Sequence, residues 1–347
     1  MNNRKKAFLV LVVLVLAVSP AFAQTINIQD AYDAFVDLGE EVARGLTLNS
    51  TLGLNWSDAY IGQILNKSPG PLLNKPPHFG VGVMAGVTSI SKDKVLDALK
   101  KADIDSSDFD DIALFALPAA AGELRLGGFF LPFDIGVKVG VLPSLDIQDM
   151  SFSYTFVGFD VRYALVKEEP KGWKPNVSVG VGFNYIREKI DGISIGSGSS
   201  IDWDIPSGGG ITGGTVSLSD PNLELDWSNM TLDLKAQVSK RLIYIFTPYL
   251  GLGSSFGWST FDYRVSAPVT YGGSSNLTLL IEDLAKLGIP LNISDASVSG
   301  EEKVFTFGLR AYGGLAINMW KIILDLTGMY SFLDQNYGAS VGLRVQI

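Results

Sequence analysis

The chain has 347 residues, a formal net charge of −9, 38 glycines and no cysteine. The lack of cysteine excludes disulfides and thiolate-based metal or redox chemistry. The acidic balance argues against a nucleic-acid partner, whose phosphates need a concentrated basic surface. No Pro-rich or charged linker divides the chain into two soluble domains. No cofactor and no metal are predicted.

Residues 1–23 have the pattern of a secretory signal peptide. Basic residues at positions 4–6 precede an unbroken apolar run, Ala7–Val18, and the small-x-small sequence Ala21-Phe22-Ala23 follows it. A membrane-spanning helix needs roughly 20 apolar residues, so this run is too short to be an anchor. Later apolar runs are interrupted within a few residues. We therefore expect export of the chain, with any membrane crossing made by strands.

Alternation of apolar and polar residues with a period of two is the strongest signal after the signal peptide. In Tyr244–Trp258, large apolar residues alternate with Gly, Ser and Thr, which gives one face suited to lipid and one suited to a polar interior. These segments have the length that a tilted strand needs to cross a bilayer. They predict ten strands, at residues 78–90, 121–130, 133–142, 150–166, 175–190, 222–240, 243–265, 302–318, 320–332 and 336–347.

Twelve strands is the alternative count. Residues 46–56 also alternate, and with residues 112–117 as a partner they would add two strands. Both counts are even, as is usual for single-chain bacterial barrels.

The connections between the ten strands alternate in length. Short joins at residues 131–132, 167–174, 240–242 and 319–320 are separated by joins that are mostly long. Outer-membrane barrels have short periplasmic turns and long outer loops, whereas a soluble sandwich has no reason to keep this order. The sequence therefore predicts an all-β, transmembrane up-and-down antiparallel β-barrel over residues 78–347, with both ends of the chain in the periplasm.

Residues 24–77 are predicted to form a helical hatch or a periplasmic segment. Over residues 28–45, apolar side chains recur at three- and four-residue spacing, which indicates an amphipathic helix. A second short helix is expected at residues 58–65. Because we expect the chain to enter from the periplasm, our hypothesis is that this segment folds up into the barrel and restricts the pore. The candidate hatch residues are Tyr32, Phe35, Leu38 and Val42.

Aromatic residues gather at the two ends of the predicted strands. Phe246 and Phe256 are ten residues apart, which corresponds to roughly 25 Å along a tilted strand and matches a lipid-facing band. The sequence therefore predicts two aromatic girdles at the membrane surfaces. The girdle residues are Tyr244, Phe246, Phe256, Trp258, Trp320 and Tyr330.

Charged residues on the opposite face are predicted to point into the lumen. Six are basic and five are acidic, so they do not form a ring of one sign that would select ions. They either pair into salt bridges that fill a narrow lumen or line a polar path. The residues are Glu123, Arg125, Asp134, Lys138, Asp160, Arg162, Asp233, Lys235, Arg310, Asp325 and Arg344.

The last residues resemble the C-terminal signal that the barrel assembly machinery reads. Gly342, Leu343 and Val345 lead to Ile347, which takes the place of the usual terminal aromatic. The chain as a whole resembles bacterial outer-membrane β-barrel proteins of the porin type. Its plan of a hatch before a barrel is similar to that of the fatty-acid transporter barrels, whose Asn-Pro-Ala motif it lacks. The resemblance implies an outer-membrane location, surrounding outer-membrane lipid and the assembly machinery as a partner.

Two functions remain open. The only histidine, His78, has no nucleophile or carboxylate placed around it in the sequence, so no enzyme is predicted. The first hypothesis is passive uptake of a small or hydrophobic solute, gated by the N-terminal segment. The alternative is a structural or surface-interaction (adhesin-like) barrel with a closed lumen. In either case we expect a monomer.

Overall fold

The structure is a computed structural model that describes most of the chain beyond residue 25. The ranges described are 26–59, 61, 78–101, 115–127, 132–147, 150–168, 172–194, 200–242, 245–272, 277–289, 291–294 and 297–346.

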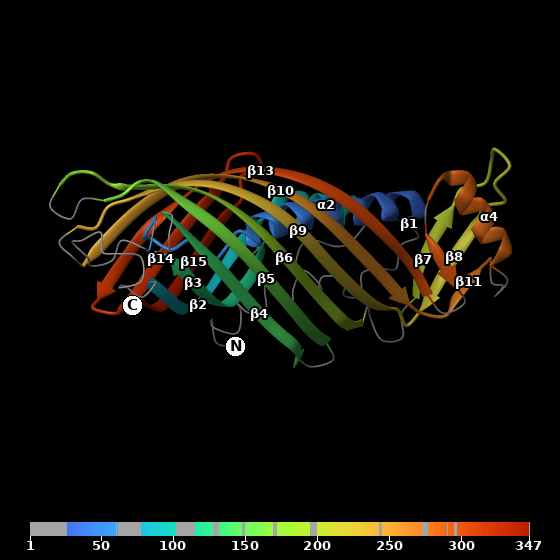
Figure 1. The fold of residues 1–347 in the computed structure, drawn as a ribbon. Helices are drawn as coiled ribbons and strands as arrows, with labels where there is room; N and C mark the ends of the chain where they lie inside the picture. Colours follow the sequence, from blue (N-terminus) through green and yellow to red (C-terminus); the bar gives the residue numbers. More distant parts are fainter. Residues whose placement is uncertain are drawn as a thin grey trace.

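Ten antiparallel strands form a closed barrel (Figure 1). Neighbours in sequence pair with one another, and β10 pairs with β13 across the long connection between them. The ring is closed by β15 against β2, and the short β12 (Asn292–Ser294) adds to β13 outside the ring. The ten strands are β2 (His78–Ile90), β3 (Phe115–Gly127), β4 (Phe133–Ile147), β5 (Met150–Val166), β6 (Asn176–Ser194), β9 (Asn222–Ser239), β10 (Phe246–Ser266), β13 (Ser297–Met319), β14 (Ile322–Ser331) and β15 (Tyr337–Gln346).

The predicted fold class and the count of ten strands are confirmed, and the alternative of twelve is wrong. Residues 46–49 are the last turn of a helix, and residues 50–56 are a turn at 50–51 followed by irregular chain, so the alternation there does not make a strand. Residues 115–117 belong to β3, and 112–114 lie outside the described residues.

The outer wall of the barrel is an apolar band. On β10, Leu250, Leu252 and Trp258 are exposed while the residues between them are buried or half-buried. Valines, leucines and phenylalanines do the same on the other strands, for example Val83 and Val141, each more than 60% exposed. A water-soluble protein rarely exposes a contiguous apolar surface of this extent. This wall is therefore suited to lipid.

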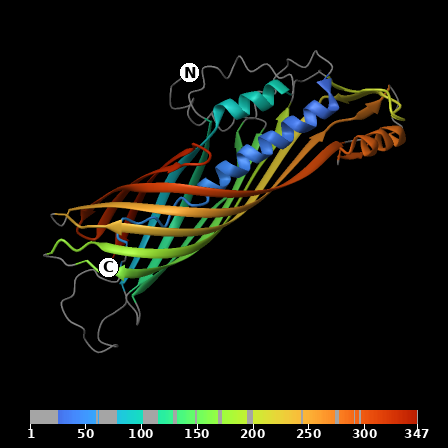
Figure 2. The same cartoon turned by 90° about the horizontal axis from the view of Figure 1, so that it is seen from above.

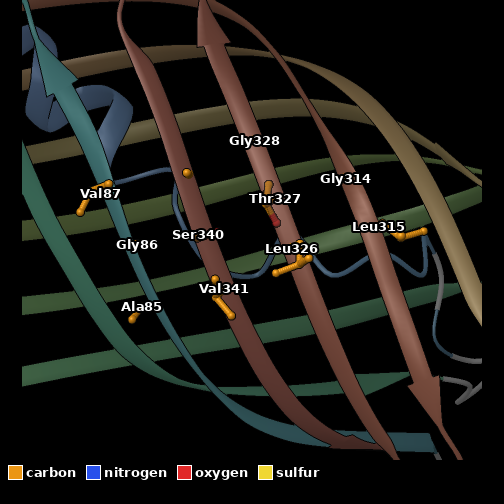
Figure 3. A pocket seen from close by; sticks show the side chains of 11 residues that line it. Ala85, Gly86, Val87, Gly314, Leu315, Leu326, Thr327, Gly328, Ser340 and Val341 are labelled. Atoms are coloured by element: carbon orange, nitrogen blue, oxygen red, sulfur yellow. The ribbon is translucent and has the colours of Figure 1, made fainter.

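A shallow groove of about 750 Å³ interrupts the band where β2, β15, β14 and β13 lie side by side (Figure 3). Small residues, among them Ala339 and Gly328, leave the hollow between Val87, Leu326 and Val341. It opens on the outer wall and not on the lumen, since these three larger side chains are all exposed.

Four strands continue beyond the apolar band at one end. Past the row of Trp258 and Phe305, whose tilted rings lie 5.7 Å apart between centroids, outward positions on β6, β9, β10 and β13 become charged. Arg187 pairs with Asp226 across β6 and β9, with 2.5 Å between Nη2 and Oδ2. We call this part of the barrel the outer extension.

A small cap lies at the tip of the outer extension (Figures 1 and 2). Its sheet has the order β1, β7, β8, β11, and the helix α4 packs beside it. Trp203, Val216 and Leu280 are buried in its core. Its elements are β1 (Ile26–Asn27), β7 (Ser200–Ile205), β8 (Gly214–Ser219), β11 (Val269–Tyr271) and α4 (Thr278–Leu287).

The N-terminal segment runs through the barrel from the cap to the opposite end. The helix α2 (Ile28–Asn49) starts beside the cap and lies along the inner face of the outer extension (Figure 2). The helix α3 (Lys92–Lys101) packs against it at the barrel mouth. From Ser50 to Ile61 the chain descends through the lumen.

The direction of this path differs from the sequence-based expectation. The short turns and the C-terminal end of β15 lie at the end opposite the cap, which is the periplasmic end of an outer-membrane barrel. We expected the helix to lie at that end or to fold up into the barrel from it, but the structure has the start of α2 at the end with the long connections, beside the cap. Alternation along strands carries no information on which mouth a helix occupies. Of the predicted helix at 58–65, residues 60 and 62–65 lie outside the described residues.

None of the helices in the described ranges is long and apolar enough to span a membrane.

We predict that Leu252→Arg destabilises the barrel in lipid by about 2–4 kcal/mol, because it places a charge in the middle of the lipid-facing band. Thr260→Arg, on the same face of β10 but beyond the band, is the control and should cost under about 1 kcal/mol. Denaturant titration in lipid vesicles measures both. Equal losses for the two variants would contradict the placement of the band.

Candidate functional site

The lumen holds a network of buried ion pairs between opposite charges on adjacent strands and on strands one further apart. Arg125 contacts both Asp134 and Asp160, with 2.7 Å between its Nη2 and Oδ1 of Asp160. Arg162 binds Asp134 through two bonds of 2.9 Å, and Lys235 reaches Asp160 at 2.5 Å. All five side chains are buried. Since an unpaired buried charge is costly, these pairs satisfy one another across β3, β4, β5 and β9.

Two further pairs complete the network. Arg310 holds Asp233 in a bidentate contact at 2.8 and 2.9 Å, and Arg344 pairs with Asp325. Bidentate Arg–carboxylate contacts fix geometry as well as charge. These partners lie on β13, β9, β15 and β14, so together with the first group they join the wall around the ring.

The two remaining predicted lumen charges bind the N-terminal segment. Glu123 and Lys138 face each other across β3 and β4, and each makes hydrogen bonds to the segment. Lys138 donates to the carbonyl oxygens of Ser50, at 2.7 Å, and Leu52. Glu123 accepts a bond from the amide of Leu54. Both charges are buried, and their partners, mainly backbone groups, belong to a segment far away in sequence.

Leu54 shows how firmly the segment is held. Its φ of 55° is rare for a residue with a side chain and costs of order 1–3 kcal/mol. Glu123 accepts from its amide, and Arg125 donates to its carbonyl at 2.9 Å. Hydrogen bonds to charged groups are worth about 1.5–3 kcal/mol each, which offsets the backbone strain.

Trp56 is the largest side chain that the segment places in the lumen. Its indole N–H donates to Glu123 at 2.7 Å, and the Arg344 guanidinium lies over its ring at 4.5 Å. A Cβ added to Gly80 of the wall would come within 2.5 Å of this ring. Gln237 donates to the Trp56 carbonyl at 2.8 Å. The wall is thus shaped around this one residue.

At its lower end the segment is fixed by Asp58. This carboxylate pairs with Arg344 and with Arg241, each at 3.1 Å. The amide of Ser57 donates to Asp325 at 3.2 Å, and that of Ile61 donates to Asp134 at 3.1 Å. Four charged side chains of the barrel therefore hold Ser57, Asp58 and Ile61 of the segment near the periplasmic end.

At its upper end the segment is held by neutral hydrogen bonds. Thr47 contacts Thr306 at 2.6 Å between the hydroxyl oxygens and accepts a bond from Asn229 at 3.0 Å. A Cβ at Gly257 would lie 2.1 Å from the Thr47 hydroxyl, so only glycine fits there. Little space remains, since the gap near Arg310 and Thr47 is about 10 Å³, room for one water at most.

The predicted hatch residues lie on α2 within the outer extension. Tyr32 donates to Glu302 at 2.6 Å, and burial together with this bond raises the pKa of Tyr32 to about 12. Phe35 stacks on Tyr263 with ring centroids 4.7 Å apart. Leu38 and Val42 pack in the apolar core. Lower on the helix, the buried Glu41 accepts from Lys94 of α3 at 2.9 Å.

The cap is organised by one buried carboxylate. Asp283 of α4 accepts bonds from the amides of Thr212 and Gly213, from the Tyr271 hydroxyl at 3.0 Å and from Lys286. Burial alone would raise the pKa of Asp283, but these donors outweigh it and lower the pKa below its usual range. The negative charge on Asp283 therefore ties the β7–β8 hairpin to α4.

The predicted girdle and assembly residues lie on the outer wall or outside the described residues. Trp258 and Phe246 are exposed on β10, Phe256 and Tyr330 are half-buried, and Trp320 is 91% exposed at a periplasmic turn. Their role as girdles remains a proposal. Leu343 and Val345 face outward on β15 and Gly342 faces inward. Tyr244 and Ile347 lie outside the described residues.

Several lumen residues were not found from the sequence. Trp56, Asp58 and Gln237 bind across the lumen, but their partners are distant in sequence, so spacing gives no signal. Trp56 stood out only as part of an alternating stretch. Among the described residues, no cluster of three or more His, Cys, Asp or Glu side chains has the geometry to hold a metal ion.

A closed antiparallel barrel with an apolar outer wall and a charged, filled lumen defines a β-barrel protein of the bacterial outer membrane. The chain belongs to the Lsa36-like family, whose sequence model matches residues 115–347. The sequence matches no curated protein.

Solved structures similar to this chain are also outer-membrane barrels. They include Ail, the attachment invasion locus protein of Yersinia pestis, at 10% identity and a TM-score of 0.29, covering 79% of this chain and 100% of that chain. The translocator domain of autotransporter NalP from Neisseria meningitidis has 8% identity and a TM-score of 0.33, covering 79% and 89%. The outer membrane protease OmpT from Escherichia coli has 9% identity and a TM-score of 0.40, covering 82% and 100%. Likeness at this level carries no argument about function.

We predict that Trp56→Ala lowers the free energy of unfolding by about 3–5 kcal/mol, the usual cost of deleting a large buried aromatic. It removes the bond to Glu123 and the contact with Arg344. Trp173→Ala is the control, since Trp173 is 97% exposed. Denaturant unfolding followed by gel mobility compares them, and equal stability of both variants would show that the segment does not support the barrel.

We predict that Asp283→Asn makes the cap sensitive to protease near residues 208–213 at neutral pH. Because the folded pKa is lowered, the stabilisation by Asp283 is present above about pH 4 and is lost as the pH falls below it. The wild-type cap should therefore open on acidification, and the variant should show no such change. Limited proteolysis between about pH 2 and pH 7, a range that extends well below the usual Asp pKa of about 3.9, tests this, with the exposed Glu282→Gln as control.

Proposed function

We propose that this protein is a closed outer-membrane barrel that works through the structure it presents outside the membrane. Of the two functions that the sequence leaves open, this is the closed surface-interaction barrel and not the passive-uptake channel. One observation carries the proposal: charged side chains of the wall bind the backbone of residues 50–61 at successive levels of the lumen.

The binding of the segment supports a closed lumen. Lys138, Glu123 and Arg125 make bonds to carbonyls and amides that would otherwise need water. Removing the segment would remove the hydrogen bonds that it makes to Glu123 and Lys138, at a cost of about 1.5–3 kcal/mol for each bond to a charged group. Spontaneous opening to a solute is therefore unfavourable.

The outer extension and cap support a role at the cell surface. The strands continue beyond the apolar band with charged outward positions, and the cap has its own apolar core. The outer extension and the cap reach further than is needed to span the bilayer. Connecting segments on a rigid scaffold commonly carry binding functions.

We predict that the full chain shows no stable conductance in planar bilayers, and that deletion of residues 26–61 opens the barrel to ions. The double variant Glu123→Gln/Lys138→Met is a second test that keeps the chain length and weakens the hold on the segment.

The control is Asp204→Asn, an exposed cap residue away from the lumen. It should stay silent, while the double variant should show brief openings. Steady conductance or liposome swelling with the unchanged protein would overturn the closed lumen and favour passive uptake.

A further inference from the structure

We propose that the barrel carries its own N-terminal end across the outer membrane, so that the chain at Ile26 reaches the cell surface through the lumen. This goes beyond the proposed function, and its test is independent of whether the lumen conducts ions. It rests on the path of residues 26–61.

The first part of the path lies outside the apolar band. Ile26 pairs with Trp203 in the cap, where β1 lies parallel to β7. Tyr32 binds Glu302, and Phe35 stacks on Tyr263. On the outer wall the same strands carry Asp262 and Glu301, which lie past the aromatic row of Trp258. The start of the path is therefore on the outer side.

The last part of the path lies at the periplasmic end. Asp58 pairs with Arg344, two residues before the end of β15, and with Arg241 in the short connection after β9. The amide of Ala59 donates to Ser239, the last residue of β9, at 3.0 Å. The chain next enters the described structure at His78, the start of β2 at this same end.

Counting membrane crossings gives the same result. The ten strands begin and end on the periplasmic side, since their number is even. The lumen segment adds one more crossing, so Ile26 and the end of β15 lie on opposite sides. A hatch that entered from the periplasm and returned would add none. Because outer-membrane barrels are built from the periplasmic side, the N-terminal end has to pass through the barrel.

The wall is fitted to a chain in this position. Glycines lie where the segment comes closest: a Cβ at Gly80 would meet Trp56, and one at Gly257 would meet Thr47. Charged and polar groups then bind the backbone from Ser50 to Ile61. An extended chain in the lumen thus finds hydrogen-bond partners that replace water along the whole crossing.

The chain has no cysteine, so single cysteines can report on which side each part lies. Asp33→Cys, on the exposed face of α2, should react with a membrane-impermeant maleimide on intact cells expressing the full chain. Gly209→Cys in the β7–β8 hairpin is the outer control, and Trp173→Cys in the β5–β6 turn is the periplasmic control. The expected result is that positions 33 and 209 react on intact cells and position 173 reacts only after permeabilisation.

The proposal is wrong if Asp33→Cys, like Trp173→Cys, reacts only after permeabilisation. A second measurement covers a labelling variant that fails to fold: Thr47→Cys/Thr306→Cys should form a disulfide, since the two hydroxyl oxygens lie 2.6 Å apart. A hydrophilic peptide of about 30 residues placed before Ile26 should then be cut by protease on intact cells. If the disulfide forms but the peptide is protected, the segment is in the lumen without export, and the proposal is wrong.

Discussion

Every buried charge in a barrel lumen has to find a partner, because the walls and the surrounding lipid exclude the water that would otherwise solvate it. The strands can pair most of their lumen charges with one another, as Arg310 does with Asp233. Glu123 and Lys138 lie opposite each other on β3 and β4, and both make hydrogen bonds to the N-terminal segment as well. The backbone of the segment supplies these further donors and acceptors. The wall and the segment are thus two parts of one hydrogen-bonded interior.

Glycine on the wall makes this arrangement possible. A ten-stranded barrel has a narrow interior, and long side chains such as Arg125 and Lys138 fill much of it. At Gly136, Gly158 and Gly253 an added Cβ would come within 3 Å of one of these long side chains. The absence of side chains at these points gives the charges room to turn toward the segment. The room that the wall glycines leave, and not charge alone, determines where the segment can pass through the lumen.

Much of the barrel follows from the sequence, because alternation with a period of two is a local property. It places β5 at residues 150–166 without error and the other strands within a few residues, except that β3 and β13 begin five or more residues earlier and β4 ends five residues later than predicted. The lumen phase of residues such as Arg162 follows from the same alternation. The partners of these charges do not, since Arg344 meets Asp58 only after the ring has closed. The end of the barrel at which α2 lies is likewise set by tertiary contacts and not by helical periodicity.

Because the wall and the N-terminal segment contact each other throughout the lumen, their sequences are expected to change together in evolution. The family resemblance covers residues 115–347, which include most of the wall but none of the segment that the wall holds. Trp56 and Asp58 nevertheless lie against Glu123 and Arg344, so a change on one side would select for a compensating change on the other. In a hybrid that joins this barrel to the N-terminal segment of a relative, the side chains of the segment and those of the wall would no longer match.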